Sequence, residues 1–170
     1  MVMEVVLKPI GVIHVDASDE EVASSLHGVD GIIEVYPEYA DGLKGIDGFS
    51  HIIVLAYLHK VSSEGRRVLV IRHRRFLRFG FKLEELPEAG VFASDSPVRP
   101  NPIALTIVGL KRRDGRFLYV SNLDLFNGTP VLDIKPYTPE RSINRSELKL
   151  PDWYVEFWSK VKSRLGEVPL

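Results

Sequence analysis

Apolar residues recur at every second position through most of this chain, and this period constrains the fold more than any other feature. Successive side chains of a β-strand point to opposite faces, so alternation of this kind is typical of strands. The segments that show it are EVVLKPIGVIHV (residues 4–15), GIIEVYP (31–37), HIIVLAYLH (51–59), RVLVIRHRRF (67–76), IALTIVGLKRR (103–113), RFLYVSNLDLF (116–126) and VLDIKPY (131–137). The pattern predicts an all-β fold, mainly an antiparallel β-barrel.

Local turn and helix signals complete this expectation. Asp-Gly at 114–115 and Asn-Gly at 127–128 separate strand patterns and favour tight hairpin turns. Ser18 followed by Glu21 is a capping box, so a short N-terminal helix should begin there. The segment PDWYVEFWSKVKSRLG (151–166) places its apolar residues on one stripe, which predicts a C-terminal α-helix.

Composition places the chain among globular proteins without disulfides. It has 170 residues, 45% of them hydrophobic and 26% charged, and its lack of cysteine excludes thiolate metal sites. We expect a barrel domain over residues 1–140 and a helical extension over 141–170 packed on it. Without a membrane-length apolar run or a signal peptide, the expected location is cytoplasmic, with no membrane contact. The absence of glutamine points to a heat-adapted source.

The stretch VFASDSPVRPNPIAL (91–105) carries prolines at positions 97, 100 and 102. Proline has no N–H group for a strand ladder, so this stretch is not a central strand. The residue before each proline is held in extended geometry, which puts Arg99 and Asn101 on the same side of the chain. Such a backbone has little entropy left to lose on binding. We therefore predict a stiff ligand-binding loop.

Positive charge is concentrated in RRVLVIRHRRFLRFGFK (66–82). This segment contains six arginines, one lysine and no acidic residue, in a chain whose net charge is −1. Guanidinium groups suit phosphates, and the interleaved phenylalanines suit unstacked bases. We expect a strand on which Arg72, Arg74 and Arg75 contact RNA. The alternative is an exposed strand whose phenylalanines face the core and whose arginines are solvated.

Three further patterns have weaker functional interpretations. GLKGIDG (42–48) precedes a strand rather than a helix, so it predicts a tight turn and not a dinucleotide site. His51 and His59 bracket one strand without other ligands at suitable spacing, so we expect no metal site. Asp133 and Lys135 share a strand face, where they can do acid–base chemistry or form a solvated ion pair.

Three segments together resemble one family. GLKGIDGFSHIIVL (42–55), VFASDSPVRPNPIAL (91–105) and LDLFNGTPVLDIKPY (123–137) resemble the TrmO/TsaA-like family of tRNA methyltransferases, in the family's order, from about Pro9 to Glu140. The resemblance implies a β-barrel that binds S-adenosylmethionine without a Rossmann fold, commonly as a homodimer. It also implies methylation of N6 of threonylcarbamoyl-adenosine, next to the anticodon of tRNA.

The motifs also imply site residues. Cofactor contacts carried over by position are His59, Lys60, Leu105, Asp124, Leu125, Phe126 and Asn127. Arg99 and Asn101 match the polar positions of the family's proline loop and would build the substrate pocket. The substrate nitrogen is a poor nucleophile. We therefore expect Asp133 to act as a base, or Lys135 to stabilise the deprotonated form.

Departures from the family pattern leave other functions open. Ser94-Asp95-Ser96 stands where the family loop typically has Thr-Arg-Ser, so an acid replaces an arginine. Residues 14–31 look helical where the family usually has a loop with proline and glutamine. One alternative is a diverged, non-catalytic barrel that binds S-adenosylmethionine or RNA. Another, a structural barrel with an exposed basic strand, explains the arginines but not the stiff loop.

Overall fold

The computed structural model describes residues 3–166, in which most elements follow the predicted pattern. The strands are β1 (Gly11–His14), β2 (Val29–Val35), β3 (His51–Tyr57), β4 (Val70–Arg72), β5 (Glu88–Gly90), β6 (Ile103–Asp114), β7 (Phe117–Leu123) and β8 (Pro130–Pro136). The α-helices are α1 (Asp19–Ser24) and α2 (Asp152–Leu165). None of the helices within the described range is both long and apolar enough to span a membrane.

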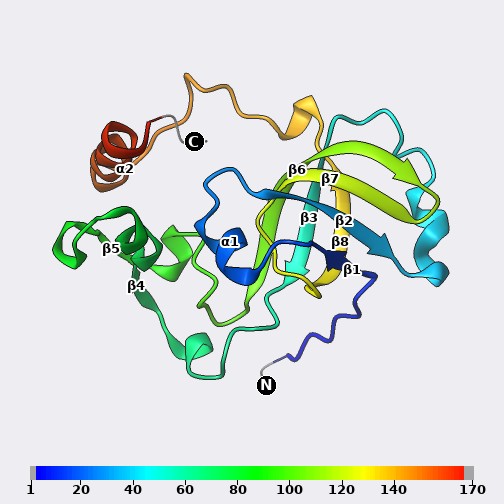
Figure 1. Cartoon of the computed structure of the whole chain (residues 1–170), viewed down its shortest axis with the longest axis horizontal. Helices are drawn as coiled ribbons and strands as arrows, with labels where there is room; N and C mark the ends of the chain where they lie inside the picture. The colour runs from blue at the N-terminus through cyan, green and yellow to red at the C-terminus, as the bar shows by residue number, and fades with distance from the viewer. Residues whose placement is uncertain (1–2, 167–170) are drawn as a thin grey trace.

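Six strands close into an antiparallel barrel in the order β1-β2-β7-β6-β3-β8, which confirms the expected fold class (Figure 1). Strands β6 and β7 form a hairpin, and Gly115 has a φ of +56° at the predicted Asp-Gly turn. Short β1 closes the barrel by pairing with both β2 and β8. A Cβ atom on Gly11 would lie 2.3 Å from the Glu34 carbonyl oxygen, so this close approach requires glycine.

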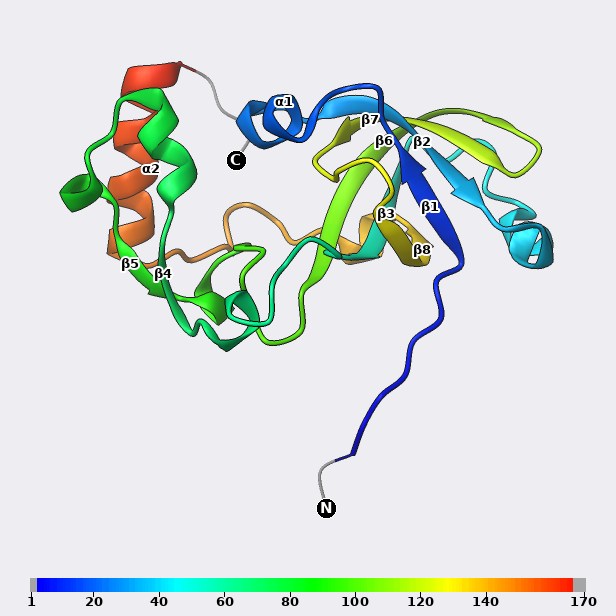
Figure 2. The same ribbon diagram turned by 60° about the horizontal axis from the view of Figure 1, so that its bottom comes forward.

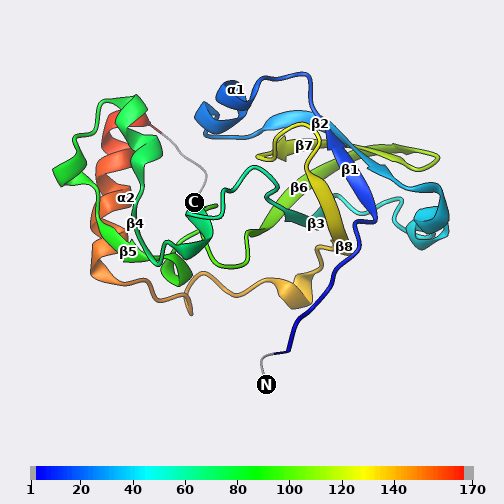
Figure 3. The ribbon, with the colours of Figure 1, turned by 90° about the horizontal axis from the view of Figure 1, so that it is seen from below.

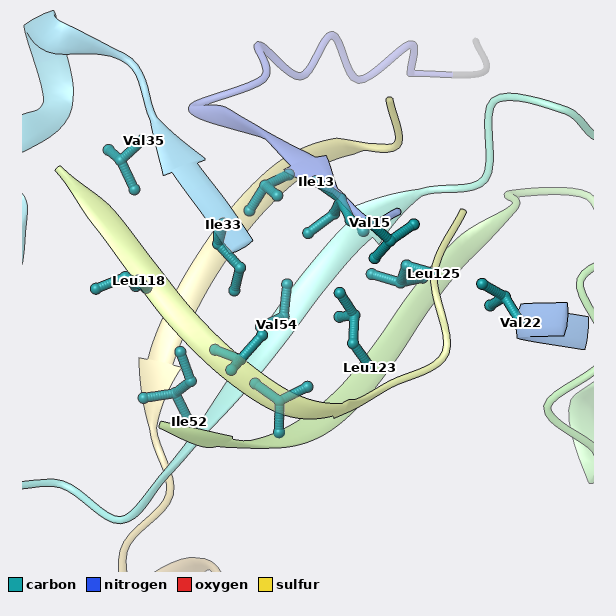
Figure 4. Packing of buried hydrophobic residues seen from close by; sticks show 14 of the residues in the cluster. Ile13, Val15, Val22, Ile33, Val35, Ile52, Val54, Leu118, Leu123 and Leu125 are labelled. Carbon is teal, nitrogen blue, oxygen red and sulfur yellow. The ribbon is translucent and has the colours of Figure 1, made fainter. Parts of the chain in front are cut away.

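Inward-facing residues of the barrel strands fill its interior. Figure 4 shows Ile13, Ile33 and Val54 gathered in the barrel interior from three strands, and Leu118 of β7 belongs to the same buried cluster. Helix α1 adds Val22 to this core, and its predicted capping box is formed: Ser18 and Glu21 exchange side-chain and backbone hydrogen bonds. The alternating pattern therefore encodes the barrel because every second side chain enters one shared core.

A second hydrophobic core lies outside the barrel. It combines buried residues of the insertion between β3 and β6 (residues 58–102) with buried residues of α2, namely Phe76, Phe81, Leu86, Phe157 and Val161. Figures 1 and 2 show α2 beside the β4–β5 hairpin, at a distance from the barrel strands. Helix α2 of the C-terminal extension thus packs against this insertion, which lies within residues 1–140.

Two strand predictions extend too far. Within residues 67–76 only Val70–Arg72 is a strand, and Arg74–Phe79 forms a 3-10 turn. In a 3-10 turn residues three apart lie on the same side, so Phe76 and Phe79 both face the second core. Within residues 4–15 the strand begins only at Gly11, and residues 3–9 precede it without a ladder partner.

Candidate functional site

Lys60, Phe126 and Asp19 come together at one end of the barrel, although they lie far apart in the sequence. The Lys60 ammonium forms an ion pair with the Asp19 carboxylate. Its nitrogen also lies 5.2 Å from the centroid of the Phe126 ring. Lys60 follows β3, Asp19 begins α1, and Phe126 lies in the β7–β8 loop. Three separate connections therefore build one charged and aromatic surface.

The β7–β8 loop is held firmly in place by the end of β1. Asn127 Oδ1 accepts a hydrogen bond from the Val15 N–H at 3.2 Å, and the Gly128 N–H donates to the Ile13 carbonyl at 2.8 Å. The Leu125 side chain is buried in the barrel core, which leaves only its backbone for a ligand. The loop therefore presents Phe126 on a rigid support.

The insertion reaches the same end of the barrel through Arg75. Its Nη2 donates to the Ser25 carbonyl, just after α1, at 3.3 Å. Burial lowers the pKa of Arg75, while the nearby Asp124 carboxylate acts in the opposite direction. Asp124, an implied cofactor contact, is thus close enough to Arg75 to interact with its charge. The implied residues Lys60, Asp124, Phe126 and Asn127 consequently gather around this end, and His59 is exposed next to Lys60.

The donor set at the barrel end matches the parts of S-adenosylmethionine. The Phe126 ring already lies beside one cation, the Lys60 ammonium, and an aromatic face of this kind can also attract a sulfonium group once that ammonium pairs with another group. The Lys60 ammonium can pair with the ligand's carboxylate, and Asp124 can accept hydrogen bonds from hydroxyl or ammonium groups. The residues present therefore fit this cofactor.

The proline loop is anchored at both of its ends. Arg99 Nη2 donates to the Val91 carbonyl at 3.0 Å, and the Leu58 N–H donates to the Pro102 carbonyl at 2.7 Å. Asn101 is exposed. Burial raises the pKa of Tyr154 on α2, and the Asp95 carboxylate raises it further. Burial lowers the pKa of His73, and the same carboxylate acts against that lowering. The loop thus brings Asp95 into electrostatic reach of the second core.

Leu105, Asp133 and Lys135 lie on the outer wall of the barrel. In the strand register Leu105 pairs with Leu55 of β3, which pairs in turn with Asp133 of β8. Asp133 and Lys135 form an ion pair at 2.7 Å, and Asp133 Oδ1 also accepts from the Ile134 N–H at 2.9 Å. Leu105 and Asp133 therefore share a wall, two strands apart, while Lys60 and Phe126 occupy the barrel end.

The predicted arginine strand is wrong in its geometry, and its three arginines are not equivalent. Arg72 donates to the Leu86 carbonyl at 2.9 Å and lies 3.5 Å from the Glu88 carboxylate. Arg75 donates to the Ser25 carbonyl, and Arg74, Arg75 and Arg78 are all exposed on the 3-10 turn. Arg78 lies three residues after Arg75 and therefore shares its side of the turn.

The GLKGIDG segment forms the predicted tight turn. Gly45 and Gly48 have φ values of +84° and +97°, which favour glycine. Arg113 Nη1 ties the turn to the β6–β7 hairpin by donating to the Leu43 carbonyl at 3.1 Å and to Asp47 at 2.9 Å. A cavity of about 580 Å³ lies against this turn, away from the implied site residues. Across residues 3–166, no cluster of three or more His, Asp or Glu side chains is arranged to hold a metal ion.

A closed antiparallel barrel with a charged and aromatic end places the chain in a class of β-barrel proteins that differs from the Rossmann-type fold. Within that class the chain belongs to the TrmO family, because the family model for the tRNA-methyltransferase O N-terminal domain matches residues 21–142. The family predicted from the three sequence motifs is therefore confirmed.

Individual relatives agree with this assignment. The chain is 36% identical over 143 residues to a Pyrococcus abyssi protein named "Probable S-adenosyl-L-methionine-binding protein", covering 82% of this chain and 71% of that one. It is 40% identical over 104 residues to the Escherichia coli tRNA (adenine(37)-N6)-methyltransferase, covering 59% and 41%. The crystal structure of TrmO from Pseudomonas aeruginosa superposes with a TM-score of 0.63 at 27% identity, covering 86% of this chain and 62% of that chain.

Proposed function

We propose that this protein is an S-adenosylmethionine-dependent tRNA methyltransferase that acts on N6 of threonylcarbamoyl-adenosine next to the anticodon. The observation that carries the proposal is the convergence of Lys60, Asp124 and Phe126 at one end of a TrmO-family barrel. A relative that is named tRNA (adenine(37)-N6)-methyltransferase supports the same reaction class.

The barrel end is the proposed cofactor site. When bound, S-adenosylmethionine supplies a methyl group that its sulfonium already activates. Lys60 is held by Asp19 in the free protein, so a ligand carboxylate has to compete with Asp19 for the ammonium. Holding both reactants in line can lower the activation barrier by roughly 7–11 kcal/mol. The anchored β7–β8 loop provides a rigid support for that alignment.

The proline loop and the insertion form the proposed substrate side. Asn101 is exposed for a polar contact with the substrate, while Arg99 holds the loop in shape through Val91. RNA contact is proposed through Arg72, Arg74 and Arg75. Arg74 is directly accessible, and the other two would exchange carbonyl partners for phosphates.

Asp133 and Lys135 are the proposed groups for proton transfer. Their ion pair places a carboxylate that could accept a proton beside an ammonium that could stabilise an anionic nitrogen, once the substrate separates the two groups. Both lie on the outer wall with Leu105. The proposal also includes a cytoplasmic location and a heat-adapted source. It further includes a homodimer, because this wall presents exposed apolar residues that a second copy can cover.

The alternative is a barrel that binds the cofactor or RNA without transferring a methyl group, and the acidic Asp95 in the loop favours it. Calorimetry with S-adenosylmethionine tests binding, and no heat at millimolar ligand with folded protein would overturn the proposal. Transfer of a labelled methyl group to tRNA with threonylcarbamoyl-adenosine, but not to tRNA lacking that modification, is the expected result. Binding without transfer would establish the alternative.

A further inference from the structure

Residues 3–8 form an apolar arm that has no partner strand. In an extended chain Met3, Val5 and Leu7 share one side, and Glu4, Val6 and Lys8 lie on the other. Met3, Val5 and Leu7 are 85%, 70% and 55% exposed. Figures 2 and 3 show this segment leaving β1 and projecting away from the rest of the chain. The arm thus has the side-chain pattern of a half-buried strand without a surface to cover it.

The outer wall of β6 has the complementary feature. Ile103, Leu105 and Ile107 occupy every second position and are 37%, 64% and 43% exposed. The alternate residues Thr106 and Val108 face the interior. Both edges of β6 are already paired, with β3 and with β7, so the strand offers its side chains and not its backbone. Contiguous exposed apolar side chains of this kind mark an interaction surface.

The two surfaces match in chemistry, number and spacing. On the side of the arm that carries Met3, Val5 and Leu7, and on the outer side of β6, three large apolar side chains repeat every two residues, about 6.8 Å along a strand; the other side of the arm carries one, Val6. The arm leaves the barrel beside β8, where the Ile10 N–H donates to the Val131 carbonyl at 2.8 Å, and it continues outward. Because it projects away from its own β6, a second copy is the partner that brings the surfaces together, and a two-fold exchange satisfies both copies at once.

We propose that the arm of one copy lies across β6 of a second copy, with Met3, Val5 and Leu7 against Ile103, Leu105 and Ile107. This inference rests on the homodimer of the proposed function and specifies its contact. Since Leu105 and Asp133 share the same wall, the partner's arm would border the proposed reaction residues. Each site would then be completed by the neighbouring copy.

Cross-linking tests the contact directly, because the chain has no natural cysteine. Differently tagged Val5→Cys and Leu105→Cys chains, the central pair of the proposed contact, are mixed and mildly oxidised, without cofactor or tRNA. The disulfide requires Cβ atoms about 3.5–4.5 Å apart. We expect a covalent heterodimer from this pair and at least fivefold less from the matched control, Val6→Cys with Leu105→Cys. Equal yields from both pairs, or no cross-linked heterodimer, would overturn the arm exchange.

Sedimentation equilibrium provides the second measurement. Val5→Asp should raise the dimer dissociation constant at least tenfold, whereas Val6→Asp, on the other side of the arm, should leave it within twofold. Far-UV circular dichroism confirms that each variant is folded. A monomeric wild type overturns both the homodimer and the arm exchange but leaves the methyl-transfer proposal standing. A dimer that Val5→Asp does not weaken overturns the arm exchange alone.

Discussion

Replacing Phe157 with alanine would remove the side chain around which the second core is organised. The Phe157 ring is buried and lies 5.1 Å from the Phe76 ring centroid in an edge-to-face arrangement, and 6.1 Å from that of Phe81. His73 stacks on it at 5.8 Å. These neighbours come from the insertion, so Phe157 is the main link between α2 and the rest of the protein.

The expected loss follows from this burial. Truncation of a buried phenylalanine costs about 3–5 kcal/mol, a large share of the 5–15 kcal/mol that stabilises a typical domain. Because the second core and the barrel core are separate clusters, the loss should fall on the insertion and α2 and leave the barrel folded. Phe157→Ala should therefore create a separate, earlier unfolding transition.

Two probes distinguish the units. The chain has two tryptophans, Trp153 and Trp158, and both lie on α2, so tryptophan fluorescence reports on the second core. Hydrogen exchange of the backbone amides in the barrel strands reports on the barrel core. In urea, the fluorescence midpoint of Phe157→Ala should fall well below the urea concentration at which the barrel amides lose protection. Val155→Ala, at an exposed position of the same helix, is the control and should change stability by less than about 0.5 kcal/mol. Coincident shifts of both probes would refute the independence of the two cores.

Four further changes have defined outcomes. Lys60→Met should weaken S-adenosylmethionine binding about 10–100-fold in calorimetry, as expected for losing a charged hydrogen bond of about 1.5–3 kcal/mol, whereas Lys60→Arg should retain most of the affinity. Asp19→Asn should strengthen the same binding, because it removes the carboxylate that competes for Lys60; weaker binding would contradict this competition. Burial, and to a smaller extent Arg75, lowers the pKa of His73 in the folded protein below its usual value of about 6.5. The neutral imidazole therefore contributes its full share to the free energy of unfolding above that pH, and this share is lost as the pH falls through the lowered folded-state pKa. His73→Phe should flatten this part of the curve of unfolding free energy against pH, and an unchanged slope would exclude His73 as its source. Asp95→Arg should raise methyl transfer to threonylcarbamoyl-adenosine tRNA, because a carboxylate repels the anionic threonyl group; a lower rate would show that Asp95 has its own role.

The sequence predicted the barrel well because its determinants are local. Alternation in residues 51–57 and 103–113 specifies strands, and the Ser18 cap specifies its helix without distant information. The geometry of residues 74–79 could not be predicted in this way. Phe76 lies within a 3-10 turn and is covered by Phe157, some 80 residues later, and no local pattern contains that contact.

The candidate site shows the same division. Family motifs indicated Lys60 and Phe126, but neither motif contains the Asp19 carboxylate that holds Lys60. The cluster of arginines around Arg72 correctly predicted where positive charge is concentrated. It did not show that Arg72 donates to the Leu86 carbonyl and lies beside the Glu88 carboxylate. Ion pairs between distant segments depend on how the insertion packs, and they become visible only in three dimensions.

The dependence of the insertion on α2 has a consequence for biosynthesis. The last barrel strand ends at Pro136, whereas the helix that completes the second core spans Asp152–Leu165. As the chain leaves the ribosome, at about 5–20 residues per second, every barrel strand is available before α2 has emerged. The phenylalanines of residues 70–90 therefore stay uncovered by α2 while the barrel, which lies beside them, closes. A nascent chain arrested between these two points would expose that apolar surface, and it is the form that a chaperone would bind.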